Sequence, residues 1–179
     1  MKHKEYRLFR YLKQPDLHAI TALKTMQGLL GLSWVKSLKR YDFWTFSLVS
    51  SQCKEDDFWS LLLSGSFEFI NPNKHAYDIG RLHKRRLDNR RSMFLLKSSA
   101  LSPCLTLSRR SFLTDKLTDV GISYSLLWEI VCERPVEDAE ACVSEMQTRL
   151  IDGQNGCSGL LVNSLFEKAE WCSQEDYYE

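Results

Sequence analysis

The residues with the most conspicuous chemistry form a basic run in the middle of the chain, from Arg81 to Arg91. Its cationic members are Arg81, Lys84, Arg85, Arg86, Arg90 and Arg91. Clustered arginines bind phosphate through paired N–H donors, so this run could hold a phosphate group or RNA. The alternative is a solvated linker, or a surface helix paired with the acidic C-terminal region. The glycine- and aromatic-rich signature of a common RNA-binding module is absent from the sequence.

Adjacent carboxylates occur twice, at Asp56-Asp57 and at Glu137-Asp138. Both pairs fall where a helix is expected to begin, and interaction with the helix dipole explains them without acid–base catalysis. Cys142 lies on the apolar face of an expected helix and should be a core residue. The sequence has neither a phosphate-binding glycine loop nor a recognisable nucleophile with its base. We therefore expect no catalytic residues and no cofactor.

The cysteines and histidines do not have the spacing of a metal site. The six cysteines contain no CxxC pair, and no two of the four histidines have a two-ligand spacing. A chain of 179 residues with 44% hydrophobic residues can form a core without disulfides, so reduced thiols are expected. The net charge of +1, the lack of a long apolar run and the charged start predict a cytoplasmic protein with no membrane partner.

The spacing of apolar residues predicts a similar order of elements in two halves. For the first half we expect a strand at 6–12, a helix from Asp16 to Leu30, a hairpin or bent strand over 34–49 with a turn at 39–42, a helix at 55–63, and a last strand at either 67–70 or 76–79. For the second half we expect a strand at 93–96, a helix from Ser108 to Gly121, a strand at 122–132, a helix at 137–150, a strand at 160–166, and an acidic, partly mobile tail from Trp171.

This order predicts an α+β fold, a duplicated ferredoxin-like βαββαβ plan with antiparallel sheets and helices on the outer faces. The expected divisions are a first half at 1–80, a basic connector at 81–92, a second half at 93–170 and the acidic tail at 171–179. Large apolar residues on the strands need burial, so we expect the two sheets to stack face to face as a pseudo-dimer. Those residues are Trp34, Phe43, Trp44, Phe46 and Trp128.

In this order of elements the chain resembles the PurS family, the small subunit of phosphoribosylformylglycinamidine synthase, and the PurS-like N-terminal domain of the single-chain enzyme. The likeness is carried by segments 6–13, 34–44 and 55–63 with Asn71-Pro72, by 93–96 and 137–150, and by the helices after Asp16 and before Gly121. The basic connector and the longer segment 97–106 depart from the family pattern.

The resemblance implies a role in purine biosynthesis as an assembly module without catalytic activity of its own. In that family the module bridges the glutaminase and the ATP-dependent synthase subunits, which are therefore the expected partners. The alternative is an RNA- or phosphate-binding ferredoxin-like module that uses the basic connector. A small enzyme with a ferredoxin-like active site is a third class, for which no acid, base or nucleophile constellation is visible.

Overall fold

The structure is a computed structural model, and it describes residues 3–49, 54–65, 69–83, 87–100, 120–152 and 159–179. The elements before the basic connector are β1 (His3–Leu12), α1 (Leu17–Gly28), β2 (Val35–Val49), α2 (Glu55–Gly65) and β3 (His75–Ile79). The elements after it are β4 (Ser92–Ala100), β5 (Gly121–Cys132), α4 (Ala139–Met146) and β6 (Glu167–Cys172). Helical turns at Val136–Asp138 and Gln147–Asp152 flank α4, and another follows β6 at Gln174–Asp176.

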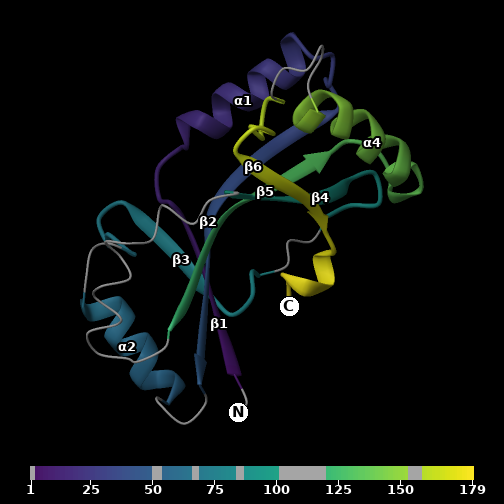
Figure 1. Cartoon of the computed structure of the whole chain (residues 1–179). Coiled ribbons are helices and arrows are strands. Elements are labelled where there is room, and N and C mark those ends of the chain that lie inside the picture. Colours follow the sequence, from purple (N-terminus) through teal and green to yellow (C-terminus); the bar gives the residue numbers. More distant parts are fainter. Residues whose placement is uncertain (1–2, 50–53, 66–68, 84–86, 101–119, 153–158) are drawn as a thin grey trace.

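The strands form one six-stranded antiparallel sheet in the order β3-β1-β2-β5-β4-β6 (Figure 1). The long strands β2 and β5 pair at its centre, from Val35 opposite Cys132 to Ser47 opposite Gly121. On one side β1 lies between β2 and β3, and on the other side β4 lies between β5 and β6. The fold is therefore α+β, as the sequence predicts.

Of the two alternatives expected for residues 34–49, the single long strand is confirmed and the hairpin with a turn at 39–42 is wrong, because β2 runs through these residues without a break. Lys39 and Arg40 pair with β5, and Asp42 pairs with β1 on one side and β5 on the other. Charged residues are tolerated inside this strand because ion pairs neutralise them. Arg40 contacts Asp16 at 2.9 Å, and Arg10 contacts Asp42. The polar run thus belongs to the middle of the sheet.

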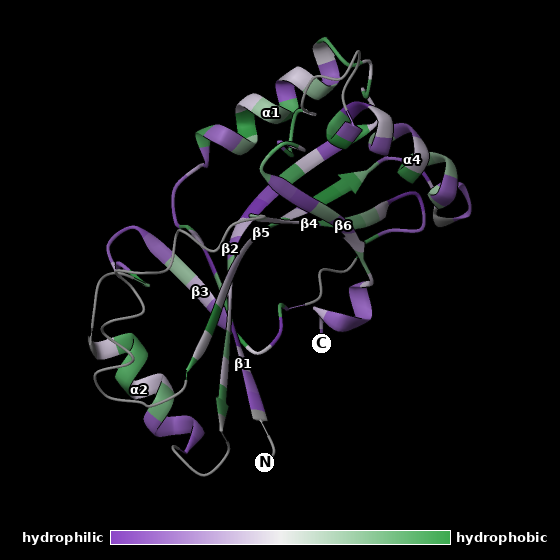
Figure 2. Cartoon of the chain, in the orientation of Figure 1, coloured by the Kyte–Doolittle hydropathy of each residue, from purple (hydrophilic) through white to green (hydrophobic). Residues whose placement is uncertain are grey.

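Helices α1, α2 and α4 cover one face of the sheet through two apolar cores. At one end of the β2–β5 pair, Met26 of α1 and Met146 of α4 pack over Leu38, Trp128 and Ile130. At the other end, α2 supplies Phe58, Trp59 and Leu62, which pack over Tyr6, Trp44 and Phe46. Figure 2 shows that apolar and polar residues alternate along these helices. The expected helices at 16–30, 55–63 and 137–150 are confirmed, the last with a π-helical final turn.

The face of the sheet opposite the helices is covered by this chain's own connector and C-terminal residues. Phe9, Phe43 and Leu127 of the strands pack against Leu82, Tyr177 and Tyr178. The expected face-to-face stacking of two sheets is therefore wrong: the halves join edge to edge through β2 and β5. The residues expected to form an acidic tail include two buried side chains, Tyr177 and Tyr178, which are 7% and 4% exposed. We call residues 173–179 the C-terminal strap.

A local turn determines where the final strand of each half begins. Asn71 begins a turn that leads into β3 at His75–Ile79, which confirms the second of the two expected positions. The last strand is β6 at Glu167–Cys172, and the expectation of a strand at 160–166 is wrong. There, Asn163 forms a turn with Glu167, and Leu161 and Val162 are buried under the helices instead.

The expected helix after Ser108 falls on residues 101–119, outside the described residues. Within the described residues, no helix is long and apolar enough to cross a membrane.

Candidate functional site

The described arginines of the basic connector contact the connector itself and the C-terminal strap. Arg81 donates from Nη1 to the backbone oxygen of Tyr178 at 3.2 Å. Arg91 Nε lies 3.6 Å from Asp88 Oδ2, and the backbone N–H of Arg90 donates to Asp88 Oδ1. Lys84, Arg85 and Arg86 lie outside the described residues. The side chains of Arg81, Arg90 and Arg91 remain exposed, so this segment presents cationic surface at the edge of the buried strap.

The paired carboxylates lie where the sequence predicts. Asp56 and Asp57 occupy the first turn of α2, and Glu137 and Asp138 occupy the short turn before α4. Cys142 is fully buried in the core beneath α1 and α4. Among the described residues, no three histidine, cysteine or acidic side chains come together as a metal site. Burial raises the pKa of Cys132 to about 12, with the neighbouring Cys142 as a second cause, which makes this thiol a weak nucleophile.

A row of four charged side chains and one tyrosine, which we call the polar belt, separates the two apolar cores on the helix-covered face. It consists of Asp16, Arg40, Arg10, Asp42 and Tyr124. Arg10 donates from Nε to Asp42 Oδ2 at 2.9 Å, and the Tyr124 hydroxyl donates to Asp42 Oδ1 at 2.8 Å. Burial and the Asp42 carboxylate raise the pKa of Tyr124 far above its usual value, so it remains a donor. The belt pairs its own charges and fixes β1, β2 and β5 to one another.

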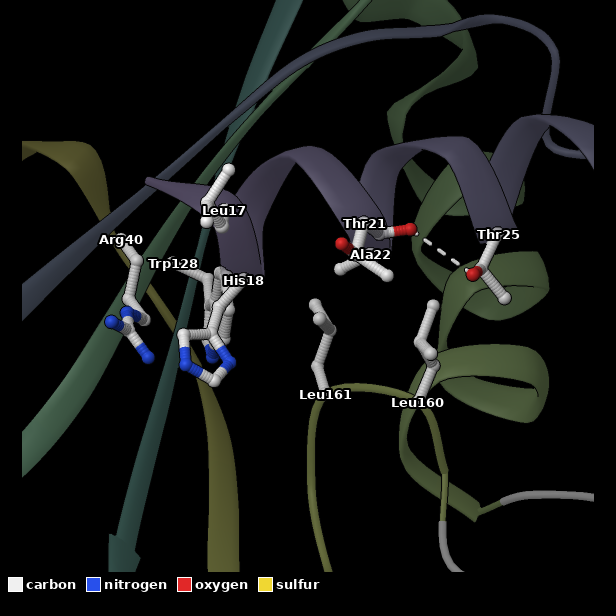
Figure 3. A pocket seen from close by; sticks show the side chains of 9 residues that line it. All are labelled: Leu17, His18, Thr21, Ala22, Thr25, Arg40, Trp128, Leu160 and Leu161. Atoms are coloured by element: carbon white, nitrogen blue, oxygen red, sulfur yellow. Dashed lines mark hydrogen bonds between the residues drawn. The ribbon is translucent and has the colours of Figure 1, made fainter. Parts of the chain in front are cut away.

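At the end of the polar belt, a pocket of about 380 Å³ opens beside α1. Figure 3 shows its walls, which come from the exposed side of α1, from β2 and β5, and from the segment before β6. The lining residues are Leu17, His18, Thr21, Ala22, Thr25, Arg40, Trp128, Leu160 and Leu161. The pocket brings together segments that are far apart in the sequence.

Asp16 holds the polar end of this pocket in place. Its Oδ1 caps α1 by accepting from the backbone N–H groups of His18 at 2.9 Å and Ala19 at 3.4 Å. Its Oδ2 lies 2.9 Å from Nε of Arg40. One carboxylate therefore fixes both the start of the helix and a guanidinium on the neighbouring strand. The guanidinium carbon of Arg40 is 5.9 Å from the centre of the Trp128 ring.

A second buried polar cluster lies on the opposite face of the sheet, beneath the C-terminal strap. Glu129 of β5 is 1% exposed, and its Oε2 accepts hydrogen bonds from the hydroxyls of Tyr41 at 2.9 Å and Tyr178 at 2.6 Å. Lys39 is the cross-strand partner of Glu129, and its ammonium lies 3.8 Å from the centre of the Tyr11 ring. The carboxylate thus binds the strap to the centre of the sheet.

Several large apolar side chains are exposed on α1 and in the segment before β6, and two of them line the pocket. Leu17 is 74% exposed at the start of α1, and Leu165 and Phe166 are 73% and 67% exposed in the turn before β6. Leu160, in the same segment, is partly exposed and lines the pocket. Grouped exposed apolar residues are typical of surfaces that contact other proteins. We call Leu17, Leu160, Leu165 and Phe166 the apolar patch.

The pocket and the apolar patch were not predicted from the sequence. Asp16 was predicted only as a helix cap, and Arg40 only as part of a turn. The available signal was the i, i+2 spacing of Arg40 and Asp42, which places both charges on one face of a strand. Comparison of the chain with protein-family models, curated proteins and solved structures finds no match.

Proposed function

We propose that the chain is a non-catalytic assembly module, built as a fused pair of similar halves and resembling PurS. In this proposal it bridges the glutaminase and synthase subunits of phosphoribosylformylglycinamidine synthase in purine biosynthesis. The single observation that carries the proposal is the order of the strands. Outward from the central pair, each side of the sheet has the second strand of its half, then the first, then the third.

The described helices are consistent with this proposal. The end of the β2–β5 pair beneath α1 is covered by one helix from each half, α1 and α4. Each half is thus completed by the other, as expected when two copies of one unit are joined through a shared sheet. We propose a duplicated ferredoxin-like plan in which one long strand, β2 or β5, takes the place of the two central strands of each βαββαβ unit.

The apolar patch is the surface that best suits a partner protein. Its side chains are exposed on α1 and in the segment before β6, and Leu17 and Leu160 line the pocket that the partly buried Arg40 also lines. Interfaces commonly combine an apolar centre with a polar rim that contains arginine. Docking there would leave the strap-covered face and the edge strands β3 and β6 free for a second partner, as bridging requires.

Co-purification with glutaminase and synthase subunits tests this proposal. The double substitution Leu165→Asp and Phe166→Asp should abolish the association, because two charges would be buried against the partner. Tyr77→Ser, on the exposed edge strand β3, is the matched control and should leave the association intact. Association that persists in the double variant would rule out the patch, and no association of the unmodified chain would rule out the assembly role.

The second candidate is binding of RNA or phosphate by the basic connector. The observation in its favour is the exposure of Arg81, Arg90 and Arg91 in the described part of that segment. Such binding would weaken steeply with added salt, because it releases counterions. Replacing Arg90 and Arg91 by glutamate should abolish it, and RNA binding insensitive to both changes would eliminate this candidate.

A further inference from the structure

We propose that the pocket beside α1 binds a small organic anion, with its carboxylate or phosphate group at Arg40 and its apolar or aromatic body against Trp128 and Leu160. This ligand site goes beyond the assembly role and does not depend on it. Small-molecule sites are typically concave and mostly apolar, with a few polar groups that fix the ligand's orientation. The pocket volume of about 380 Å³ lies at the lower end of their usual size.

Arg40 supplies the cationic end of the pocket. Its ion pair with Asp16 uses Nε, and the terminal nitrogens of the guanidinium provide four further N–H donors. Paired N–H donors of this kind match the two oxygens of a carboxylate or phosphate. The side chain of Arg40 is 25% exposed and that of Asp16 is 14% exposed, so solvent screens a charge here less than at the open surface. His18 lines the same end of the pocket and can add a further donor.

Trp128 supplies the aromatic wall of the pocket. It is 6% exposed, it lines the pocket, and its indole N–H is buried without an acceptor among the described residues. Figure 3 shows Trp128 in the inner wall, beside His18 and Arg40. The nitrogen itself has almost no accessible surface, so a ligand oxygen would have to displace neighbouring side chains to accept from it. The ring face suits a flat ligand body.

The rest of the pocket is suited to an apolar body. Leu17, Ala22, Leu160 and Leu161 line it, and Leu17 and Leu160 are exposed at its mouth. Burying such side chains under a ligand removes apolar surface from water, which favours binding. Thr25 donates its hydroxyl to the backbone oxygen of Thr21, so its oxygen can still accept a hydrogen bond from a ligand. The arrangement therefore favours an amphipathic anion over a bare inorganic ion.

The test is a ligand titration of the full chain in which the NMR signal of the Trp128 indole N–H is monitored. The signal is assigned by its absence from the spectrum of the Trp128→Phe variant. The probes are benzoate, phenyl phosphate, benzyl alcohol and inorganic phosphate. Benzoate or phenyl phosphate should shift the signal with saturation, and their relative affinities identify the preferred anionic group. Benzyl alcohol and inorganic phosphate should bind at least about tenfold more weakly, because benzyl alcohol lacks the anionic group and inorganic phosphate lacks the apolar body.

Arg40→Met should weaken binding of the preferred anion by about tenfold or more. Thr21→Phe, at an exposed position of α1, should block the pocket without touching Arg40 and keeps the test informative if Arg40→Met unfolds the protein. Arg91→Met, in the connector, is the matched control and should bind normally. The proposal is overturned if neither anion binds, if benzyl alcohol or inorganic phosphate binds as tightly, or if Thr21→Phe leaves the affinity unchanged.

Discussion

The hydroxyl of Tyr178 donates a 2.6 Å hydrogen bond to Oε2 of Glu129, which joins the C-terminal strap to the centre of the sheet. Tyr41 of β2 donates to the same oxygen at 2.9 Å. The strap is also held by its backbone, because the Leu82 N–H donates to the Tyr177 oxygen at 2.7 Å and the Glu179 N–H donates to the Leu82 oxygen. Leu82 of the connector and the C-terminal strap are therefore both fixed to the sheet.

Replacing Tyr178 by phenylalanine removes one of the two described hydroxyl donors to a carboxylate that is almost completely buried. We expect the free energy of unfolding to fall by about 1 to 3 kcal/mol, the usual cost of removing a partner from a buried polar group. Urea unfolding measures the change. Tyr77→Phe, on the exposed face of β3, is the control and should change stability by less than about 0.5 kcal/mol. Equal stability of the two variants would contradict the role assigned to the strap.

Removing residues 177–179 should expose the apolar face of the sheet. Tyr177 packs edge-on to Phe9 and Phe43, with ring centres 6.1 Å and 5.5 Å apart. Loss of two buried aromatic side chains is expected to lower the free energy of unfolding by about 3 kcal/mol or more. Binding of the dye ANS, which reports exposed apolar surface, should rise. Removing Glu179 alone is the control, and unchanged dye binding in the longer truncation would show that the strap does not cover this face.

Local patterns in the sequence were sufficient for the three described helices α1, α2 and α4 but not for the middle of the sheet. Asp16 was identified as a cap and does accept from the first backbone N–H groups of α1. The residues at 39–42 were misread because their neutralising partners are distant: Arg40 contacts Asp16, and Asp42 contacts Arg10 and Tyr124. Alternation along β2 sends Arg40 and Asp42 to the helix side, and Lys39 and Tyr41 to the strap side.

The strap could not be predicted because its burial depends on tertiary contacts alone. The acidic residues around Trp171–Glu179 are typical of a solvated tail, yet Tyr177 and Tyr178 fill the face that the helices leave open. The pocket has the same origin, since Arg40, Trp128 and Leu160 approach each other only through the pairing of β2 with β5 and the position of the segment before β6. The local spacing of residues in a single sequence does not show which distant residues come into contact.

Stability should depend on pH through His75, which begins β3. Burial, followed by the positive charge of Arg10, lowers the pKa of this histidine below its usual value of about 6.5. Its Nδ1 accepts from the backbone N–H of Asn71 at 3.0 Å, which requires an unprotonated Nδ1. As the pH falls below about 6.5 the unfolded chain binds the proton first, so stability present at neutral pH is lost as the pH falls through the folded pKa.

This dependence is measured by urea unfolding at about pH 7.5 and about pH 5, with NMR titration of the imidazole. The His75→Gln variant should lose less stability across this interval than the unmodified protein. The His83→Gln variant, in which an 80% exposed side chain is replaced, should behave as the unmodified protein does. An imidazole of His75 that titrates at or above its usual value would contradict the prediction.

The most direct test of the assembly role is reconstitution with glutaminase and synthase subunits of phosphoribosylformylglycinamidine synthase. Complex mass is measured by light scattering after gel filtration, and amidine formation is measured with glutamine as the nitrogen source. We predict one complex of defined stoichiometry that contains all three chains, and glutamine-dependent activity that requires this chain. Elution of the chain apart from both subunits, with their activity unchanged by its presence, would contradict the account.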